Sequence, residues 1–386
     1  VYASRLTNIE SGQNIDFGFA EALAFSTLLQ DGVHVHLSGQ DCERGTFAHR
    51  HAVVHDQKTG NLITPLENTP DKKENLVVAN SALSEFGCLG FSLGYSAVSP
   101  KQLVIWEAQF GDFANGAQVI IDQFLSAGEA KWYRQSGLVL LLPHGYEGMG
   151  PEHSSARVER FLQLCDSDPE FKPDPQEKNI GQLYNMGVVN CSCPANYFHA
   201  LRRQVHREYR KPLIVFTHKS ILRTATSRLD EFDDIGDDTK FFHVIDDSVG
   251  PGSVKHEALA PADKIRRVIF CTGKVFYDLH NYRQKNNIND VALVRIEQLC
   301  PFHFTKVTNI GDKYANAEFM WVQEEPKNMG AWTYIKPHID SALRDSKKPE
   351  RANISYMGRH VAASPACAST AQHKREMAEY LEGAFA

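Results

Sequence analysis

Two histidines lie in a glycine-rich segment whose composition suits proton-transfer chemistry. The segment runs from Pro143 to Arg157, and His144 and His153 stand on either side of its three glycines. Glycine tolerates positive φ angles and lets a ligand approach the backbone closely. Histidine changes charge near neutral pH, so either side chain could take up or release a proton during a reaction. Each could instead satisfy a local backbone group, an alternative that stays more open for His144 than for His153.

The neighbouring elements predict where this segment lies in a fold. The apolar run from Leu138 to Leu142 is typical of a buried strand, and the pattern after Arg157 indicates a helix. Ser154 or Ser155 could cap that helix by accepting a hydrogen bond from a first-turn N–H. Ligands of open α/β sheets bind outside the carboxyl ends of the strands. We therefore expect a ligand site here.

Two other kinds of chemistry compete with proton transfer. The pairs His34 with His36 and His49 with His51 could each bring two imidazoles to a metal ion, but no acidic residue stands at a familiar spacing. A hydrolase is disfavoured because no G-x-S-x-G sequence occupies a turn from a strand to a helix. Neither G-x-G-x-x-G nor a Walker loop occurs, so the sequence lacks the usual nucleotide motifs.

Alternating strand and helix patterns predict the fold class. They indicate an α/β protein with two domains, each a mostly parallel sheet with helices on both faces. Strands are expected at 33–37, 102–106, 138–142, 188–191, 212–216, 267–271, 291–296, 318–323 and 354–357. Helices are expected at 14–30, 84–97, 116–125, 197–209, 274–284, 306–314 and 332–343.

A strongly acidic segment separates the two predicted domains. Between Arg228 and Asp238 the apolar rhythm stops and acidic residues accumulate, which is typical of a solvated connector. We expect a first domain over 1–227, a linker region over 228–264 and a second domain over 265–386.

Bulk composition excludes several function classes. The chain has 386 residues and a formal net charge of −6, and this negative balance argues against a nucleic-acid surface. Its apolar runs are far shorter than the roughly 20 residues that cross a bilayer, so we expect no membrane span. The eight cysteines lack zinc-site or disulfide-scaffold spacing, which favours reduced thiols. The start at Val1 has no signal layout, and we expect a processed product or a fragment.

Long motifs are spread over nearly the whole chain. They are Arg-Gly-Thr-Phe at 44–47, Leu-Ser-Glu-Phe-Gly at 83–87, Trp-Glu-Ala-Gln-Phe-Gly-Asp-Phe at 106–113, the segment 144–157, Lys-Ser-Ile-Leu-Arg at 219–223, Arg-Ile-Glu-Gln-Leu at 295–299 and Gln-Glu-Glu-Pro at 323–326. Together they resemble the thiamin-diphosphate-dependent 2-oxoacid dehydrogenases, most closely the first component of 2-oxoglutarate dehydrogenase complexes. The resemblance implies a pyrimidine-binding domain followed by a transketolase-like C-terminal domain.

The resemblance implies cofactor-binding residues in the first domain. Glu85 matches the glutamate that bonds N1′ of the aminopyrimidine and so favours deprotonation of the thiazolium carbon. A carboxyl group that shares a proton with a ring nitrogen suits this catalytic role. Phe113 matches the aromatic residue that stacks on the aminopyrimidine, with Phe110 as the alternative. Gln109 would be a neighbouring contact of the cofactor.

The resemblance also separates the two histidines. His153 matches a catalytic histidine that handles protons after decarboxylation and during transfer to a lipoyl disulfide. His144 would line the same substrate pocket. The implied reaction is oxidative decarboxylation of 2-oxoglutarate with reductive succinylation of a lipoyl group on the acyltransferase of the complex. The partners would be the 2-oxo acid, the lipoyl domain and a second copy of the chain in a homodimer, in the mitochondrial matrix of a eukaryote or the cytoplasm of a bacterium.

One motif of this class of enzymes is missing. They hold Mg²⁺ and the pyrophosphate through Gly-Asp-Gly followed by a distant asparagine, and no Gly-Asp-Gly occurs here. We therefore expect this chain to carry the pyrimidine half of the site and no metal ligands, with the magnesium half preceding Val1 or coming from another chain. Two alternatives stay open: a 2-oxoadipate dehydrogenase first component, and a noncatalytic scaffold or regulatory relative that lacks the magnesium half.

Overall fold

The chain folds into two units that each contain a mostly parallel sheet. The computed structural model describes residues 1–174, 177–223, 232–236, 238–247, 251 and 259–386. The first unit comprises residues 1–143 and 193–241, and the second comprises residues 144–192 and 242–386. Much of the acidic connector expected over 228–264, namely 228–231, 237, 248–250 and 252–258, lies outside the described residues.

Five parallel strands of the first unit lie side by side in the order β8-β6-β5-β1-β4. Leu37 in the middle of β1 pairs with Ile105 of β5 on one side and Val78 of β4 on the other. The elements of this unit are α1 (Tyr2–Ser11), α2 (Phe17–Gln30), β1 (His34–Gly39), β2 (Val54–His55), β3 (Leu62–Ile63), β4 (Leu76–Asn80), α3 (Glu85–Ser96), β5 (Gln102–Glu107), α4 (Gln118–Ile120), α5 (Gly128–Trp132), β6 (Val139–Pro143), α7 (Pro194–His206) and β8 (Leu213–Thr217).

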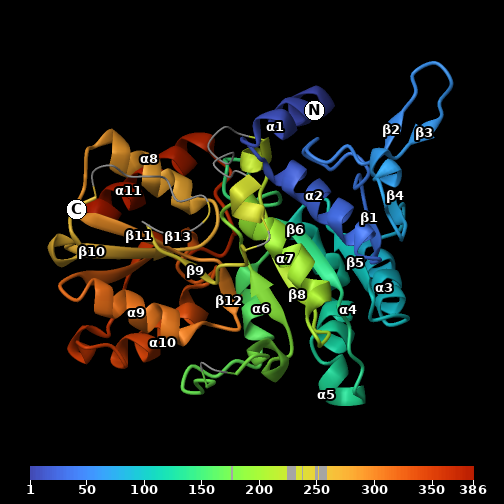
Figure 1. The fold of residues 1–386 in the computed structure, drawn as a ribbon. Coiled ribbons are helices and arrows are strands. Elements are labelled where there is room, and N and C mark those ends of the chain that lie inside the picture. Colours follow the sequence, from blue (N-terminus) through green and yellow to red (C-terminus); the bar gives the residue numbers. More distant parts are fainter. Residues whose placement is uncertain (175–176, 224–231, 237, 248–250, 252–258) are drawn as a thin grey trace. The chain divides into compact units, whose positions relative to one another are not determined.

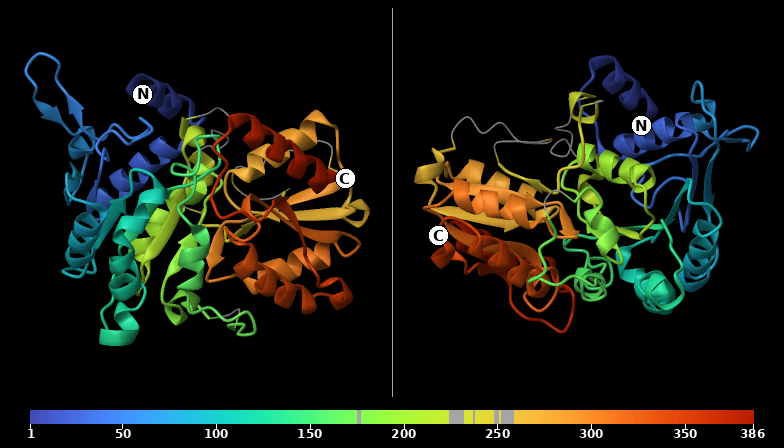
Figure 2. Two further views of the ribbon diagram at one scale, coloured as in Figure 1. Left: turned by 180° about the vertical axis from the view of Figure 1, so that it is seen from behind. Right: turned by 60° about the horizontal axis from the view of Figure 1, so that its bottom comes forward.

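Helices cover both faces of this sheet (Figure 2). Helices α2 and α7 pack against each other on one face, and α3 to α5 lie on the other. Asp16 starts α2 because its side chain accepts a hydrogen bond from the N–H of Phe19 at 2.8 Å. Strand β6 is buried along its whole length, which explains its uninterrupted apolar sequence.

The second unit has its own sheet, with the strand order β14-β13-β10-β11-β9. Strand β9 is antiparallel to β11, and the other pairs are parallel. Figure 1 shows α8 and α11 on one side of this sheet and α9 and α10 on the other. Its elements are α6 (Val158–Gln163), β7 (Gly187–Val189), β9 (Val244–Ile245), β10 (Arg267–Cys271), α8 (Val275–Lys285), β11 (Val291–Ile296), β12 (Gln298–Cys300), α9 (Phe304–Lys313), β13 (Glu318–Pro326), α10 (Trp332–Arg344), β14 (Ser355–Arg359) and α11 (Thr370–Phe385).

The predicted α/β class with parallel sheets is confirmed. The helix expected over 116–125 is instead a composite of a 3-10 turn over Gly111–Ala117, the short α4 and a π turn over Ile121–Leu125. The sequence analysis assigned neither β4 nor α11. Within the described residues, no helix combines the length and apolar character that a bilayer span requires.

Candidate functional site

Glu85 is the first residue of α3, and its carboxylate is half-buried. The side-chain amide of Gln40 donates to Glu85 Oε1 over 3.5 Å, which is a long hydrogen bond. A Cβ atom placed on Gly116 would lie 3.2 Å from Glu85 Oε2. The carboxylate therefore lies against a bare stretch of backbone, and a side chain at this glycine would crowd it.

Glu85 and Gln109 line the same small cavity. The cavity lies where the carboxyl ends of β1 and β5 meet the beginning of α3, the position expected for a ligand on a parallel sheet. Its walls are formed by Gly39, Gln40, Leu83, Glu85, Cys88, Trp106, Glu107, Ala108 and Gln109. Two side chains that are 24 positions apart in the sequence are thus brought together at one edge of the sheet.

Gln109 and Phe113 belong to the segment that follows β5. The Gln109 side-chain amide donates to Asp41 Oδ2 at 2.8 Å, so its orientation is fixed. Phe113 lies in the 3-10 turn that also contains Gly116, and its ring meets Phe110 edge-on with centroids 5.9 Å apart. Phe110 in turn meets Phe47 at 5.4 Å. Glu85, Gln109 and Phe113 all belong to the first unit.

His144 belongs to the second unit, where it is almost fully buried. Its Nδ1 atom accepts a hydrogen bond from the N–H of Ala156 at 3.1 Å. A ring nitrogen that accepts carries no proton, so the proton lies on Nε2, which donates to Glu325 Oε1 at 2.9 Å. Both ring nitrogens are therefore engaged within the fold, and His144 acts first as a cross-link between its loop and β13.

His153 is half-buried in a turn of the same loop. The turn is closed by a hydrogen bond from Gly145 N–H to the carbonyl oxygen of Ser154 at 3.0 Å, and Ser154 Oγ donates to the carbonyl oxygen of Gly150 at 2.6 Å. The expectation that a serine caps the next helix is wrong. Arg157 occupies the N-cap position of α6 in a left-handed conformation, and no side chain caps that helix.

The paired histidines considered for metal binding have other partners. His34 Nε2 is hydrogen-bonded to the Tyr95 hydroxyl at 3.1 Å, and the His36 ring stacks on Tyr95 at 4.4 Å. Burial lowers the pKa of His49 to about 3, with the neighbouring Arg50 adding to the effect. Among the described residues, no group of three His, Cys, Asp or Glu side chains is arranged to hold a metal ion.

One sequence in the first unit has the spacing of a hydrolase nucleophile motif. Gly90 to Gly94 reads G-x-S-x-G, but these residues lie inside α3 and not in a strand-to-helix turn. Ser92 is fully buried, and its hydroxyl donates to the carbonyl oxygen of Cys88 at 3.0 Å. The serine is thus a core residue, in agreement with the expectation against a hydrolase.

A buried ion network beside the cavity was not predicted from the sequence. Arg50 Nε lies 2.5 Å from Glu21 Oε1, and Arg50 Nη2 lies 2.6 Å from Glu107 Oε1. The Tyr197 hydroxyl donates to Glu21 at 2.7 Å. Two signals could have revealed it: Glu21 interrupts the apolar helix α2, and Glu107 ends the apolar strand β5.

Burial opposes ionisation of all three charged groups in this network. Burial alone would lower the pKa of Arg50, but attraction to Glu107 and Glu21 raises it well above its ordinary value. Burial would likewise raise the pKa of Glu21, yet Arg50 and Tyr197 hold it below its ordinary value. For Glu107 burial prevails, and its pKa is raised.

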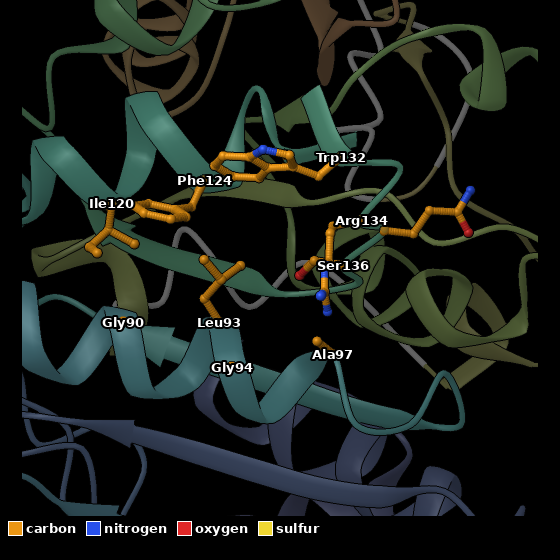
Figure 3. A pocket seen from close by; sticks show the side chains of 11 residues that line it. Gly90, Leu93, Gly94, Ala97, Ile120, Phe124, Trp132, Arg134 and Ser136 are labelled. Carbon is orange, nitrogen blue, oxygen red and sulfur yellow. The ribbon is translucent and has the colours of Figure 1, made fainter. Parts of the chain in front are cut away.

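A larger cavity of about 750 Å³ lies elsewhere in the first unit, between α3 and the segment from α4 to the start of β6 (Figure 3). Phe124 and Trp132 form much of its apolar wall, with ring centroids 5.5 Å apart. None of the predicted site residues lines it. Its lining residues are Gly90, Leu93, Gly94, Ala97, Ile120, Phe124, Gly128, Trp132, Arg134, Gln135 and Ser136.

Comparisons with known proteins cover the whole chain. Residues 13–224 match the family model described as transketolase, pyrimidine binding domain, and residues 227–385 match the model described as 2-oxoglutarate dehydrogenase C-terminal. Over 385 residues the chain is 51% identical to the mitochondrial 2-oxoglutarate dehydrogenase of Dictyostelium discoideum. This alignment covers 97% of the chain and 37% of the Dictyostelium protein.

Two further relatives give the same result. The chain is 46% identical to the mitochondrial 2-oxoglutarate dehydrogenase of Schizosaccharomyces pombe, over 99% of this chain and 37% of that protein. It is 47% identical to the 2-oxoglutarate dehydrogenase E1 component of Brucella anthropi, over 99% of this chain and 36% of that protein. The chain thus spans a little over a third of the length of the curated relatives it matches.

Proposed function

Because this chain belongs to the transketolase pyrimidine-binding domain family, with a 2-oxoglutarate dehydrogenase C-terminal region after it, we propose that it supplies the pyrimidine half of a thiamin-diphosphate site in a 2-oxoglutarate dehydrogenase first component. The observation that carries the proposal is the position of Glu85. Its half-buried carboxylate lies at the carboxyl end of a parallel sheet, in a cavity shared with Gln109.

The residues beside Glu85 have the chemistry that a flat heteroaromatic ring requires. The bare backbone at Gly116 leaves room beside the carboxylate that a Cβ atom would fill. Phe113 supplies an aromatic face on the adjacent turn. When bound, thiamin diphosphate supplies a carbon nucleophile for the keto group of the substrate and accepts the electrons released with carbon dioxide.

The remaining roles belong to residues of this chain. Glu85 would share a proton with N1′ of the pyrimidine, Phe113 would offer its ring for stacking, and Gln109 would contact the cofactor through an amide whose orientation Asp41 fixes. His153 moves protons after decarboxylation and during acyl transfer to a lipoyl group. His144 lines the substrate pocket, and because both of its ring nitrogens are hydrogen-bonded, its part is to shape the loop.

Magnesium and the pyrophosphate would be held by residues outside this sequence, since the sequence has no Gly-Asp-Gly.

The functional division is a pyrimidine-binding domain over 1–227, a linker region over 228–264 and a C-terminal domain over 265–386. The protein works as a homodimer with a lipoyl-bearing acyltransferase as its partner, in the mitochondrial matrix if the source is a eukaryote and in the cytoplasm if it is a bacterium.

The test is deuterium exchange at the thiazolium carbon in the complete enzyme. Glu85→Ala should lower the exchange rate by at least about 100-fold, since general acid–base groups contribute about 10²- to 10⁴-fold. Glu10→Ala, which removes an exposed carboxylate of α1, is the control and should exchange at the parent rate. Exchange within threefold of the parent in Glu85→Ala would refute the assignment.

A further inference from the structure

The buried network around Arg50 connects three elements of the first unit. Arg50 lies in the segment between β1 and β2, Glu21 in α2, and Glu107 at the end of β5. Arg50 Nη1 and Nη2 reach the two Glu107 carboxylate oxygens at 2.7 and 2.6 Å. The same guanidinium reaches Glu21 at 2.5 and 3.1 Å. Each carboxylate is thus held bidentately, which fixes direction as well as distance.

The network is a costly way to stabilise a core. Arg50, Glu21 and Glu107 are 4%, 1% and 5% exposed, and two carboxylates share one guanidinium. Desolvation of such groups consumes most of their mutual attraction, and apolar residues of equal volume often stabilise a core as well. What bidentate pairs add is fixed geometry. The network therefore contributes mainly by fixing the positions of the side chains around it.

Arg50 fastens the segment that follows β1 to the end of β5. Besides Glu107, its Nη1 atom donates to the carbonyl oxygen of Cys42 at 2.8 Å. At the start of the segment, a Cβ atom on Gly39 would lie 2.2 Å from the carbonyl oxygen of Glu107, so the two backbones touch. Residues 39–42 are therefore held against β5 at both of their ends.

Of the two residues between these ends, Gln40 lines the cavity, and Asp41 is hydrogen-bonded to a residue that lines it. Gln40 donates to Glu85 Oε1 over 3.5 Å, and Asp41 accepts from the side-chain amide of Gln109 at 2.8 Å. Asp41 has a φ of 55°, in the left-handed region that aspartate tolerates in turns. Its carbonyl oxygen accepts a hydrogen bond from the N–H of Gly45 at 2.8 Å, which closes the turn locally.

We propose that Arg50 is a positioning residue for the pyrimidine half-site: by joining Glu107 and the Cys42 carbonyl, it holds Gln40 against Glu85 and Asp41 against Gln109. This inference rests on the proposed function, because holding Gln40 and Asp41 in place affects catalysis only if Glu85 acts on the cofactor. The guanidinium of Arg50 bonds to Glu21, Glu107 and the Cys42 carbonyl oxygen, so its effect on Glu85 and Gln109 passes through the segment 39–42.

The test variant in the complete enzyme is Arg50→Lys, which keeps the positive charge but cannot bridge both carboxylates and the carbonyl together. Arg202→Lys is the matched control, because Arg202 makes a half-exposed ion pair with Asp31 in the same unit. Two quantities are measured: amide hydrogen exchange of residues 39–52 without cofactor, and deuterium exchange at the thiazolium carbon of added thiamin diphosphate with Mg²⁺.

In Arg50→Lys, amide exchange over 39–52 should rise at least about tenfold, since the clamp sets the opening free energy of this segment. Exchange at the thiazolium carbon should fall between about 10- and 100-fold, because displacements near 1 Å have effects of that size. Arg202→Lys should leave both rates within twofold of the parent. If Arg50→Lys does not fold, Glu107→Gln is judged by the same criteria, because it preserves volume but replaces one of the two accepting carboxylate oxygens by an NH2 donor and so breaks the bidentate pair.

Two results would overturn the positioning role. One is amide exchange over 39–52 within twofold of the parent. The other is faster amide exchange with an unchanged rate at the thiazolium carbon. Failure of the proposed function has a different signature, in which Glu85→Ala itself exchanges normally. Loss of exchange in Glu85→Ala together with parental rates in Arg50→Lys would refute the positioning role alone.

Discussion

Lys274 is a buried cation that follows β10 in the second unit, and its removal gives a sharp test of how that unit is stabilised. Its Nζ atom lies 2.7 Å from Asp278 Oδ2 and 3.0 Å from Glu324 Oε2. The lysine side chain is 9% exposed, and the two carboxylates are 19% and 6% exposed. The substitution Lys274→Met preserves length and apolar volume but leaves both carboxylates without this cation.

The pKa values show how strongly the three groups depend on one another. Burial alone would lower the pKa of Lys274, but attraction to Glu324 and Asp278 raises it above its ordinary value. Burial raises the pKa of Asp278 even with the lysine present. Burial would also raise the pKa of Glu324, but attraction to Lys274 holds it below its ordinary value.

Removing one partner of a buried ion pair costs about 3 to 5 kcal/mol. Proton uptake by Asp278 relieves part of that cost, so we expect a loss of about 3 kcal/mol in the free energy of unfolding near pH 7.5. For a domain of this size, 1 kcal/mol shifts Tm by about 2 to 4 °C. The second unit of Lys274→Met should therefore unfold roughly 6 to 12 °C below that of the parent.

The pH dependence has a definite sign. Without the lysine, the folded-state pKa values of Asp278 and Glu324 rise above their unfolded values. A carboxyl group whose pKa is raised by folding contributes stability that is present at low pH and lost as the pH rises through its folded-state pKa. The difference in unfolding free energy between parent and variant should therefore be smaller at pH 5.5 than at pH 7.5.

The assay is thermal unfolding at these two pH values, followed by circular dichroism and by hydrogen exchange of peptides from each unit. Lys336→Met is the matched control, because Lys336 pairs with Asp340 at the same spacing of four residues but is 38% exposed. The control should lose less than about 0.5 kcal/mol, the usual contribution of such a surface pair. A loss below about 1 kcal/mol in Lys274→Met, or an equal loss at both pH values, would contradict the reasoning.

Three further predictions follow from other parts of the molecule. In the complete enzyme, His153→Ala should leave deuterium exchange at the thiazolium carbon unchanged but slow acyl transfer to a lipoyl acceptor by about 10²-fold or more; unchanged transfer would contradict its assignment. Gly18→Ala should destabilise the first unit by about 1 to 3 kcal/mol in urea unfolding, because its Cβ atom would lie 2.4 Å from the carbonyl oxygen of His49; an unchanged midpoint would mean that the loop yields freely. Cys42 should resist thiol reagents at pH 7.5 until the protein unfolds, because burial raises its pKa to about 12, and mass spectrometry that finds it modified in the native protein would contradict this.

The sequence by itself determined the fold class, because strands buried on both faces must be apolar along their whole length. The runs at 138–142 and 291–296 are examples, and the strands found at 139–143 and 291–296 match them. The edge strand β4 was not predicted because it is buried only at Leu76 and so has no continuous apolar run. Helix α11 was not predicted because its buried residues, Tyr380, Leu381, Ala384 and Phe385, all lie in the last turns, so no apolar stripe runs along its whole length.

The residues of the candidate site could be predicted from the sequence, but the contacts between them could not. Glu85, Gln109, Phe113 and His153 could be proposed from local motifs, because each stands inside a long matching segment of the sequence. Two contacts could not be predicted from the sequence, because such contacts leave no periodic signal along the chain. They are the close approach of Gly116 to Glu85 and the hydrogen bond from Gln109 to Asp41. These predicted roles await the exchange experiments.

Only the tertiary structure decided the parts played by the buried polar side chains. Arg50 reaches Glu21 and Glu107, which lie 29 and 57 positions away, and nothing in the sequence pairs them. His144 was open to two interpretations until its nitrogens were found bonded to Ala156 and to Glu325, 181 positions away. A buried ion or imidazole requires a partner, but only the folded chain determines which distant residue lies within hydrogen-bonding distance.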